Sequence, residues 1–380
     1  MTTSGIVDVH EELFEGEATG LEVEQFSDGD PHKPWDPDKI RVSTKTFSLR
    51  NIIDMVNEKS LELAPDFQRN KVWKARQKSR LIESILLQIP LPAFYFSEDA
   101  DGMLRVVDGL QRLSTVLAFT GGDDDSFALE NLEYLDESKI GKTFDSLEAA
   151  LRRRLHNTQI VVHVIDPTTP PEVTYNIFKR LNTGGTPLNA QEIRHCMTKE
   201  RSRNFLRDCA ANPNFHVVTG GSLRNNVRMG DREAVLRFCA FRLRGPQEYQ
   251  HVASMDAFLL ETSQMLDDIG RVSDEVLNQL LIDFDRAMVN AYAVFGDQAF
   301  RKWWSLDQKG RNPINRPLLE SWSVALAELT TQQAVADAEA IRNASFELMG
   351  DPKFVEAIST STGDRFKVAY RFERTRGAVK

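Results

Sequence analysis

The strongest constraint on the fold is a short apolar run that ends in Asp-Gly and continues directly into an amphipathic stretch. Residues 104–107, which are apolar except for Arg105, form a run typical of a buried strand, and Asp108-Gly109 is a turn signal. The stretch that follows repeats apolar residues at helical spacing and stops at Gly121-Gly122, a pair that favours helix termination. The sequence therefore predicts a strand–turn–helix unit, a common building block of α/β and α+β folds.

The turn also carries side chains suited to anion chemistry. Amide groups and the positive dipole end at a helix N-terminus favour an anion. Arg112 offers a planar fork of donors that fits phosphate. Asp108 offers a carboxylate for a metal ion or for orienting a nucleophile. The alternative is an ordinary capped helix in which Asp108 and Arg112 pair with each other, and the pattern alone leaves both interpretations open.

Two kinds of structure follow one another along the chain. Strand patterns at 93–96, 104–107 and 159–165 alternate with helical patterns up to about residue 195. From residue 189 onward only helical patterns remain, at about 190–198, 201–210, 231–243, 254–268, 274–295, 317–329 and 334–348. We therefore expect an α+β domain over residues 42–195 and an all-helical domain over residues 196–380.

Charge is distributed unevenly between the two ends of the sequence. Residues 1–38 hold 11 acidic residues and one basic residue, whereas the remainder holds 45 and 46. The low content of core-forming residues predicts an acidic, disordered, solvated tail over residues 1–41. The alternative is a nucleic-acid mimic that occupies a basic groove.

The other end, residues 365–380, is basic and interleaves aromatic residues with its charges. It suits either a phosphate-tracking surface or a final amphipathic element packed on the body. On the first interpretation the candidate DNA contacts are Arg371, Arg374 and Arg376.

Composition excludes several classes of protein. Three scattered cysteines, Cys196, Cys209 and Cys239, are too few for a disulfide framework or a zinc knuckle, which fits a reducing compartment. We find neither a signal-like segment nor an apolar run of membrane-spanning length. We therefore expect a cytoplasmic protein without a membrane partner.

Several segments together resemble the N-terminal domain of GmrSD-type restriction endonucleases, in the ParB/sulfiredoxin-like superfamily. Their order and spacing match over about residues 60–200. The segments are Gln68-Arg69 with Trp73, Leu-Ile-Glu-Ser-Ile-Leu at 81–86, Asp-Gly-Leu-Gln-Arg at 108–112, and Phe-Lys-Arg-Leu-Asn-Thr-Gly-Gly at 178–185.

The resemblance implies a ParB/sulfiredoxin-like, nucleotide-handling domain in prokaryotic defence against foreign or modified DNA. It places a catalytic group of Asp108, Gln111 and Arg112 on the phosphates of an NTP, with Asp108 holding Mg²⁺ or Mn²⁺. The nucleotide-binding residues that it implies are Gln68, Arg69, Gly109, Arg180, Asn182, Gly184 and Gly185. The expected partners are a nucleotide, DNA, and a separate nuclease or other defence protein.

Two departures from the family pattern keep three functions open. Leu110 stands where the signature usually has Gln, and His195, His216 and His251 lack the setting of a His-Asn-His nuclease. The leading hypothesis is an NTP-binding and NTP-hydrolysing protein. The alternatives are a metal-dependent DNA-nicking nuclease that uses the same cleft, and a non-enzymatic module that senses a nucleotide or DNA.

Overall fold

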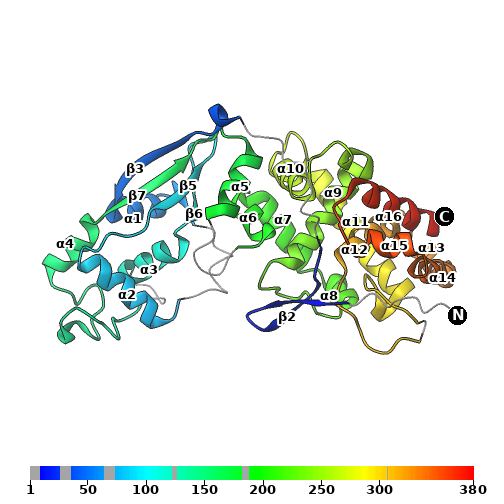
Figure 1. Ribbon diagram of the computed structural model, residues 1–380, viewed down its shortest axis with the longest axis horizontal. Helices are drawn as coiled ribbons and strands as arrows, with labels where there is room; N and C mark the ends of the chain where they lie inside the picture. The colour runs from blue at the N-terminus through cyan, green and yellow to red at the C-terminus, as the bar shows by residue number, and fades with distance from the viewer. Residues whose placement is uncertain (1–8, 26–35, 64–72, 122–125, 182–187, 306) are drawn as a thin grey trace. The chain divides into compact units, whose positions relative to one another are not determined.

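The structure is a computed structural model that describes residues 9–25, 36–63, 73–121, 126–181, 188–305 and 307–380 (Figure 1). The chain divides into two compact units, which we call the sheet unit and the helical unit. The sheet unit consists of Lys33–Leu188 with His195–Met197, and the helical unit consists of Met1–His32, Asn189–Arg194 and Thr198–Lys380. The α+β class with a helical C-terminal part, expected from the sequence, is confirmed.

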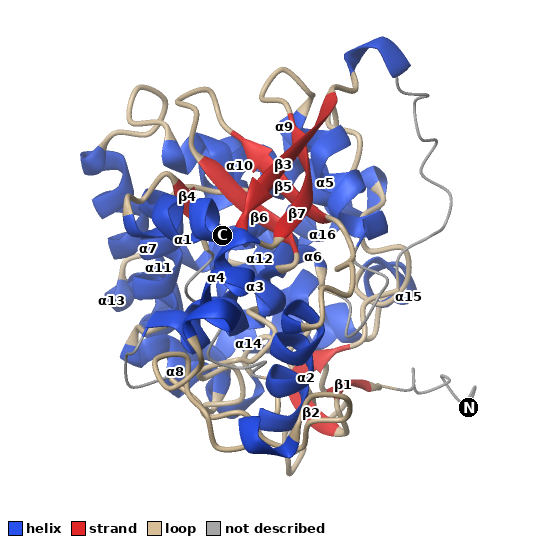
Figure 2. Ribbon diagram, turned by 90° about the vertical axis from the view of Figure 1, so that its left-hand side faces the viewer, coloured by secondary structure: helices blue, strands red, loops and turns tan. Residues whose placement is uncertain are grey.

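The sheet unit is built on a five-stranded mixed sheet, whose strands are red in Figure 2. The strand order is β3 (Val42–Ser48), β7 (Gln159–Ile165), β5 (Phe94–Glu98), β6 (Leu104–Asp108) and β4 (Leu61–Glu62). The β3–β7 and β5–β6 pairs are antiparallel, whereas β5–β7 and β4–β6 are parallel.

One face of this sheet forms the core of the unit. Along β7, Ile160, Val162 and Val164 alternate with more exposed residues and are at most 2% exposed, which is the period of a half-buried strand. They share a core with α1 (Leu49–Asn57), α2 (Ala75–Leu86), α3 (Leu110–Gly121) and α4 (Ala149–Asn157). The unit also contains α5 (Pro171–Leu181) and the short 3-10 helices η1 (Pro37–Lys39) and η3 (Glu137–Lys139).

The helical unit packs its helices around a second core. Helix α6 (Ala190–Cys196) lies in sequence at the division between the units. The helical unit then contains α7 (Glu200–Ala210), α8 (Pro213–Thr219), α9 (Gly230–Tyr249), α10 (Met255–Asp267), α11 (Asp274–Phe295), η4 (Gly296–Gln298), α12 (Arg316–Ala327), α13 (Thr331–Ala336), α14 (Ala338–Met349), α15 (Pro352–Ala357) and α16 (Arg365–Ala378).

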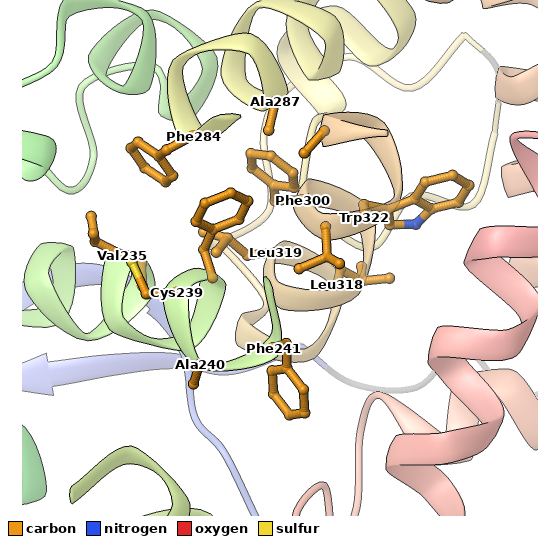
Figure 3. Packing of buried hydrophobic residues seen from close by; sticks show 14 of the residues in the cluster. Val235, Cys239, Ala240, Phe241, Phe284, Ala287, Phe300, Leu318, Leu319 and Trp322 are labelled. Carbon is orange, nitrogen blue, oxygen red and sulfur yellow. The ribbon is translucent and has the colours of Figure 1, made fainter. Parts of the chain in front are cut away.

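Three of these helices supply much of the apolar packing (Figure 3). Phe241 comes from α9, Phe284 from α11 and Trp322 from α12, and each is at most 2% exposed. Helix α9 is broken at Gly245, which has φ 74° and precedes Pro246. Among the described helices, none combines the length and the apolar character needed to cross a bilayer.

The expected disorder of the acidic tail is wrong for residues 9–25. These residues form an antiparallel hairpin, β1 (Glu11–Phe14) and β2 (Glu17–Glu22), that belongs to the helical unit. Leu21 is 2% exposed and forms a bridge with Ile314. The acidic composition was misleading because the carboxylates of this segment pair with cations far away in the sequence.

Candidate functional site

The strand–turn–helix unit forms where the sequence predicts it. Strand β6 ends at Asp108, α3 begins at Leu110, and Gly109 lies between them with φ +98°. The Gly109 carbonyl accepts a hydrogen bond from the Leu113 amide at 2.9 Å, which opens the helix. A Cβ atom on Gly109 would lie 2.2 Å from Cδ1 of Phe94. Backbone conformation and the close approach of Phe94 both require glycine here.

Replacing Gly109 by Ala should therefore destabilise the sheet unit by about 2–5 kcal/mol, the sum of a left-handed backbone penalty and overpacking against Phe94. The matched control is Gly102→Ala, because Gly102 also has positive φ (+80°) but has open space around its Cβ position. The Gly102→Ala variant should lose only the stability that the left-handed backbone conformation costs an alanine, about 1–2 kcal/mol. Thermal unfolding of both variants measures the difference, and equal losses would contradict the packing argument.

Asp108 and Arg112 form an ion pair across the first turn of α3. Nη2 of Arg112 donates to Oδ2 of Asp108 at 2.9 Å and to the Ala93 carbonyl at 3.1 Å. Nη1 donates to the Pro92 carbonyl, and the guanidinium lies over the Phe94 ring, 4.2 Å from its centroid. Burial lowers the pKa of Arg112, and the Asp108 carboxylate opposes that shift. The guanidinium nevertheless stays charged.

The two partners differ in their access to solvent. The Asp108 side chain is 40% exposed, whereas that of Arg112 is 13% exposed. Arg112 is thus held by two carbonyls and an aromatic ring, and it orients Asp108 in turn. The exposed carboxylate is the group of this pair that a ligand can reach.

The rest of the Asp-Gly-Leu-Gln-Arg segment divides between core and surface. Leu110 packs against the core of the sheet unit, which accounts for an apolar residue at this place. Gln111 is half-buried in the first turn of α3, and its carbonyl accepts a hydrogen bond from the Thr115 hydroxyl at 2.8 Å.

Arg180 is exposed in the last turn of α5, a helix that contacts β6. The other residues that the resemblance implied, Gln68, Arg69, Asn182, Gly184 and Gly185, lie outside the described residues.

The C-terminal arginines behave differently from one another. Arg371 is fully buried, and its Nε atom donates to Glu320 at 3.0 Å, so its assignment as a DNA contact is wrong. The sequence places it on a basic amphipathic helix but does not show that this face turns inward. Arg374 and Arg376 are exposed; the first lies 5.9 Å from the Tyr370 ring centroid, and the second pairs with Glu328.

Sequence reasoning missed a row of side chains that crosses the sheet beside Asp108. The Thr44 hydroxyl on β3 is 3.0 Å from Nδ1 of His163 on β7. The His163 ring and the Tyr95 ring on β5 have centroids 4.9 Å apart. Tyr95 is the strand partner of Asp108. The one signal in the sequence is the single polar residue, His163, within the apolar run 160–165.

Comparison with known proteins places part of the chain in a family. A family model described as the N-terminal domain of the GmrSD restriction endonuclease matches residues 50–198. Comparison with curated proteins finds no match for the chain. The matched range contains the Asp108–Arg112 junction, both rings of the Tyr95–His163 pair and helix α5. Residues 50–198 are therefore an N-terminal domain of the GmrSD restriction endonuclease family.

Proposed function

We propose that residues 50–198 bind a nucleoside triphosphate and hydrolyse it, as part of a prokaryotic restriction or anti-phage system. The observation that carries the proposal is the Asp108 carboxylate, held by Arg112 at the start of α3 and accessible to solvent. A helix N-terminus favours phosphate, and phosphoryl transfer depends mainly on positioning and charge stabilisation. The family of the domain supports a role in restriction.

The residues of the junction would divide the work. Asp108 would hold a divalent ion, Mg²⁺ or Mn²⁺, which takes its remaining ligands from water and phosphate oxygens and neutralises the charge of the phosphates. Arg112 is a positioning residue, because its donors fix the orientation of Asp108. Gln111 lies on the same turn, where its side-chain amide is the candidate to orient a water molecule.

The row of side chains next to the junction supports a nucleotide rather than bare phosphate. Aromatic and imidazole rings stack on nucleobases, and an open sheet face is a common platform for them. The Tyr95 and His163 rings are half-buried; Tyr95 lies on β5, the strand beside β6, and His163 lies on β7, the next strand of the sheet. A base stacked there would belong to a nucleotide whose phosphates lie at Asp108.

A second candidate function is a non-enzymatic module that senses a nucleotide or DNA and regulates a separate nuclease or another defence protein. Two contacts favour it. Leu110 packs into the core where the family signature usually offers a polar Gln, and the Arg112 donors are engaged by the carbonyls of Pro92 and Ala93. Both reduce the number of polar groups that face a transferred phosphate.

Phosphate release from each of the four NTPs, measured on the full chain with Mg²⁺ or Mn²⁺, tests the leading proposal. Asp108→Asn should lower the turnover roughly 100-fold or more, as removal of one electrostatic contributor to a transition state does. The matched control is Asp54→Asn in α1. Asp54 also pairs with an arginine four residues away, Arg50, at 3.1 Å, and its side chain is 44% exposed. That variant should keep its activity.

The other outcomes separate the alternatives. Saturable NTP binding without phosphate release, weakened in Asp108→Asn, would support the sensing module. Metal-dependent nicking of a plasmid without NTP, lost in the same variant, would support a nuclease. Equal turnover in Asp108→Asn and the unsubstituted chain would contradict a role for this junction.

A further inference from the structure

The segment Leu21–Gln25 points its charges inward and an apolar residue outward. Glu22 is 7% exposed and the Glu24 side chain 6%, whereas Val23 between them is 44% exposed. An ordinary surface strand shows the opposite pattern, because burial favours apolar side chains and disfavours carboxylates. The inward face of this segment is therefore specified by contacts to its carboxylates.

Glu22 is bound by a buried lysine and by the start of a helix. Nζ of Lys302, a residue with no exposed surface, donates to Oε1 of Glu22. Nδ2 of Asn315, the N-cap residue of α12, donates to Oε2 at 3.0 Å. Nη1 of Arg316 donates to the Glu22 backbone carbonyl at 3.1 Å. Both groups that contact the Glu22 carboxylate, from Lys302 and Asn315, are hydrogen-bond donors.

The carboxylates of Glu24 and Glu12 are also bound by cationic side chains. Arg237 on α9 donates from Nη2 to Oε2 of Glu24 at 2.7 Å and from Nη1 to Oε1 at 3.3 Å, and the Thr362 hydroxyl also donates to Oε1. Nη2 of Arg316 donates to Oε2 of Glu12 at 3.0 Å. Three carboxylates of the hairpin segment thus meet three different cations of the helical unit.

The receiving surface has the chemistry of a phosphate site. It combines Arg237, Lys302 and Arg316 with the N-terminus of α12, and both arginine forks and helix N-termini suit phosphate oxygens. Two carboxylates, Glu233 and Glu320, also pair with Arg237 and offset part of this positive charge. A small hollow adjoins it, lined in part by Ser359, whose hydroxyl has no partner within the described part of the chain. Alternate residues of an extended segment are about 6.7 Å apart, a spacing similar to that of neighbouring phosphates in an extended single strand.

We propose that Leu21–Gln25 is a built-in mimic of a nucleic-acid backbone. In the structure it occupies a groove of the helical unit that receives consecutive phosphates of single-stranded DNA once the segment leaves. DNA is the occupant that fits the restriction domain on the same chain. The proposal concerns the helical unit and is independent of nucleotide hydrolysis at Asp108.

Binding of fluorescently labelled oligo(dT) to the full chain, followed by anisotropy, tests this proposal. The double variant Glu22→Gln/Glu24→Gln removes two charges that hold the segment and should tighten binding about 10-fold or more at low salt. Two further phosphate contacts should also steepen the dependence of log K on log salt by about 1.4. The matched control is Glu15→Gln/Glu17→Gln, which changes the net charge equally at two exposed residues of the same hairpin. It should change affinity by less than about twofold, because exposed charges away from the groove are screened.

A second measurement keeps the test decisive should the double variant fail to fold. In the unsubstituted chain the Glu22 amide donates to the Ile314 carbonyl and the Ile314 amide to the Gly20 carbonyl, both at 2.9 Å. Saturating oligo(dT) should speed hydrogen exchange at both amides. The proposal is overturned if these amides keep their protection on DNA-saturated protein, or if the folded double variant and the control bind equally. It is also overturned if only inorganic polyphosphate, and not oligo(dT), releases the segment.

Discussion

Replacing Glu320 by Gln is expected to destabilise the helical unit by about 3–5 kcal/mol, because it removes the carboxylate that pairs with the buried Arg371 and one of the three that pair with Arg237. Glu320 on α12 has no exposed surface. Its Oε2 accepts from Nη1 of Arg237 at 3.1 Å, and its Oε1 accepts from Nε of Arg371 at 3.0 Å. Gln keeps the shape of the side chain, so the loss reports charge rather than packing.

A matched control lies on the same pair of helices. Glu328 follows the last turn of α12 and pairs with Arg376 on α16, with side chains 30% and 51% exposed. Glu328→Gln should cost less than about 1 kcal/mol, as exposed pairs do. Urea unfolding followed by circular dichroism compares the two variants. Similar midpoints would contradict the view that the buried network needs its full complement of carboxylates.

The same network keeps a neighbouring carboxylate ionised. Burial alone acts to raise the pKa of Glu233, but Arg237, Arg316 and Arg194 outweigh it and lower that pKa to about 2. Glu233 pairs with Arg237 through a contact of 2.9 Å. The charges of the core are thus matched as a set, which is why the removal of one member has a large effect.

Replacing Glu83 by Ala is the second change with a large expected effect, about 3–5 kcal/mol on the sheet unit. The Glu83 side chain on α2 is buried, and its Oε1 accepts the amides of Glu133, Tyr134 and Leu135 at 2.8, 2.7 and 2.9 Å. Alanine would leave three amide donors without their acceptor, and hydrogen bonds to charged groups contribute about 1.5–3 kcal/mol each before relaxation.

A single-bond control lies nearby on the same helix. The Ser79 hydroxyl is buried and, among the described residues of this loop, accepts one amide, that of Glu130, at 3.0 Å. Ser79→Ala should therefore cost about 1 kcal/mol. Thermal unfolding gives the two losses, and limited proteolysis at Lys139 and Lys142 reports whether the loop opens. Equal proteolysis rates in Glu83→Ala and the unsubstituted chain would contradict this role of Glu83.

Features set by local sequence could be predicted. Helix α11 runs from Asp274 to Phe295, as its cap Ser273 and its apolar period predict. The Asp108-Gly109 turn also lies where the sequence places it, because glycine and the adjoining patterns are local signals. The sequence left open whether Asp108 and Arg112 pair, and the structure shows that they do.

Features that depend on distant partners could not be predicted. The acidic N-terminal segment is ordered because Glu24 meets Arg237, and no local pattern shows that contact. Arg371 is buried because its partner, Glu320, lies on another helix. The stretch around residues 123–143 has an irregular sequence, yet Glu83 holds part of it from α2. In each case a charge that composition assigns to solvent is compensated inside the protein.

The bridges Leu21–Ile314 and Gln25–Thr360 also set an order for folding during synthesis. The bridge partners of residues 21–25 lie roughly 300 residues further along the chain. They are therefore synthesised about 15–60 s later at usual elongation rates. The sheet unit is nearly contiguous in sequence, so its partners are all translated in that interval. The nascent acidic segment therefore stays exposed to water without its partners, and its charge opposes aggregation of the unpaired strand. The helical unit completes its folding after the sheet unit.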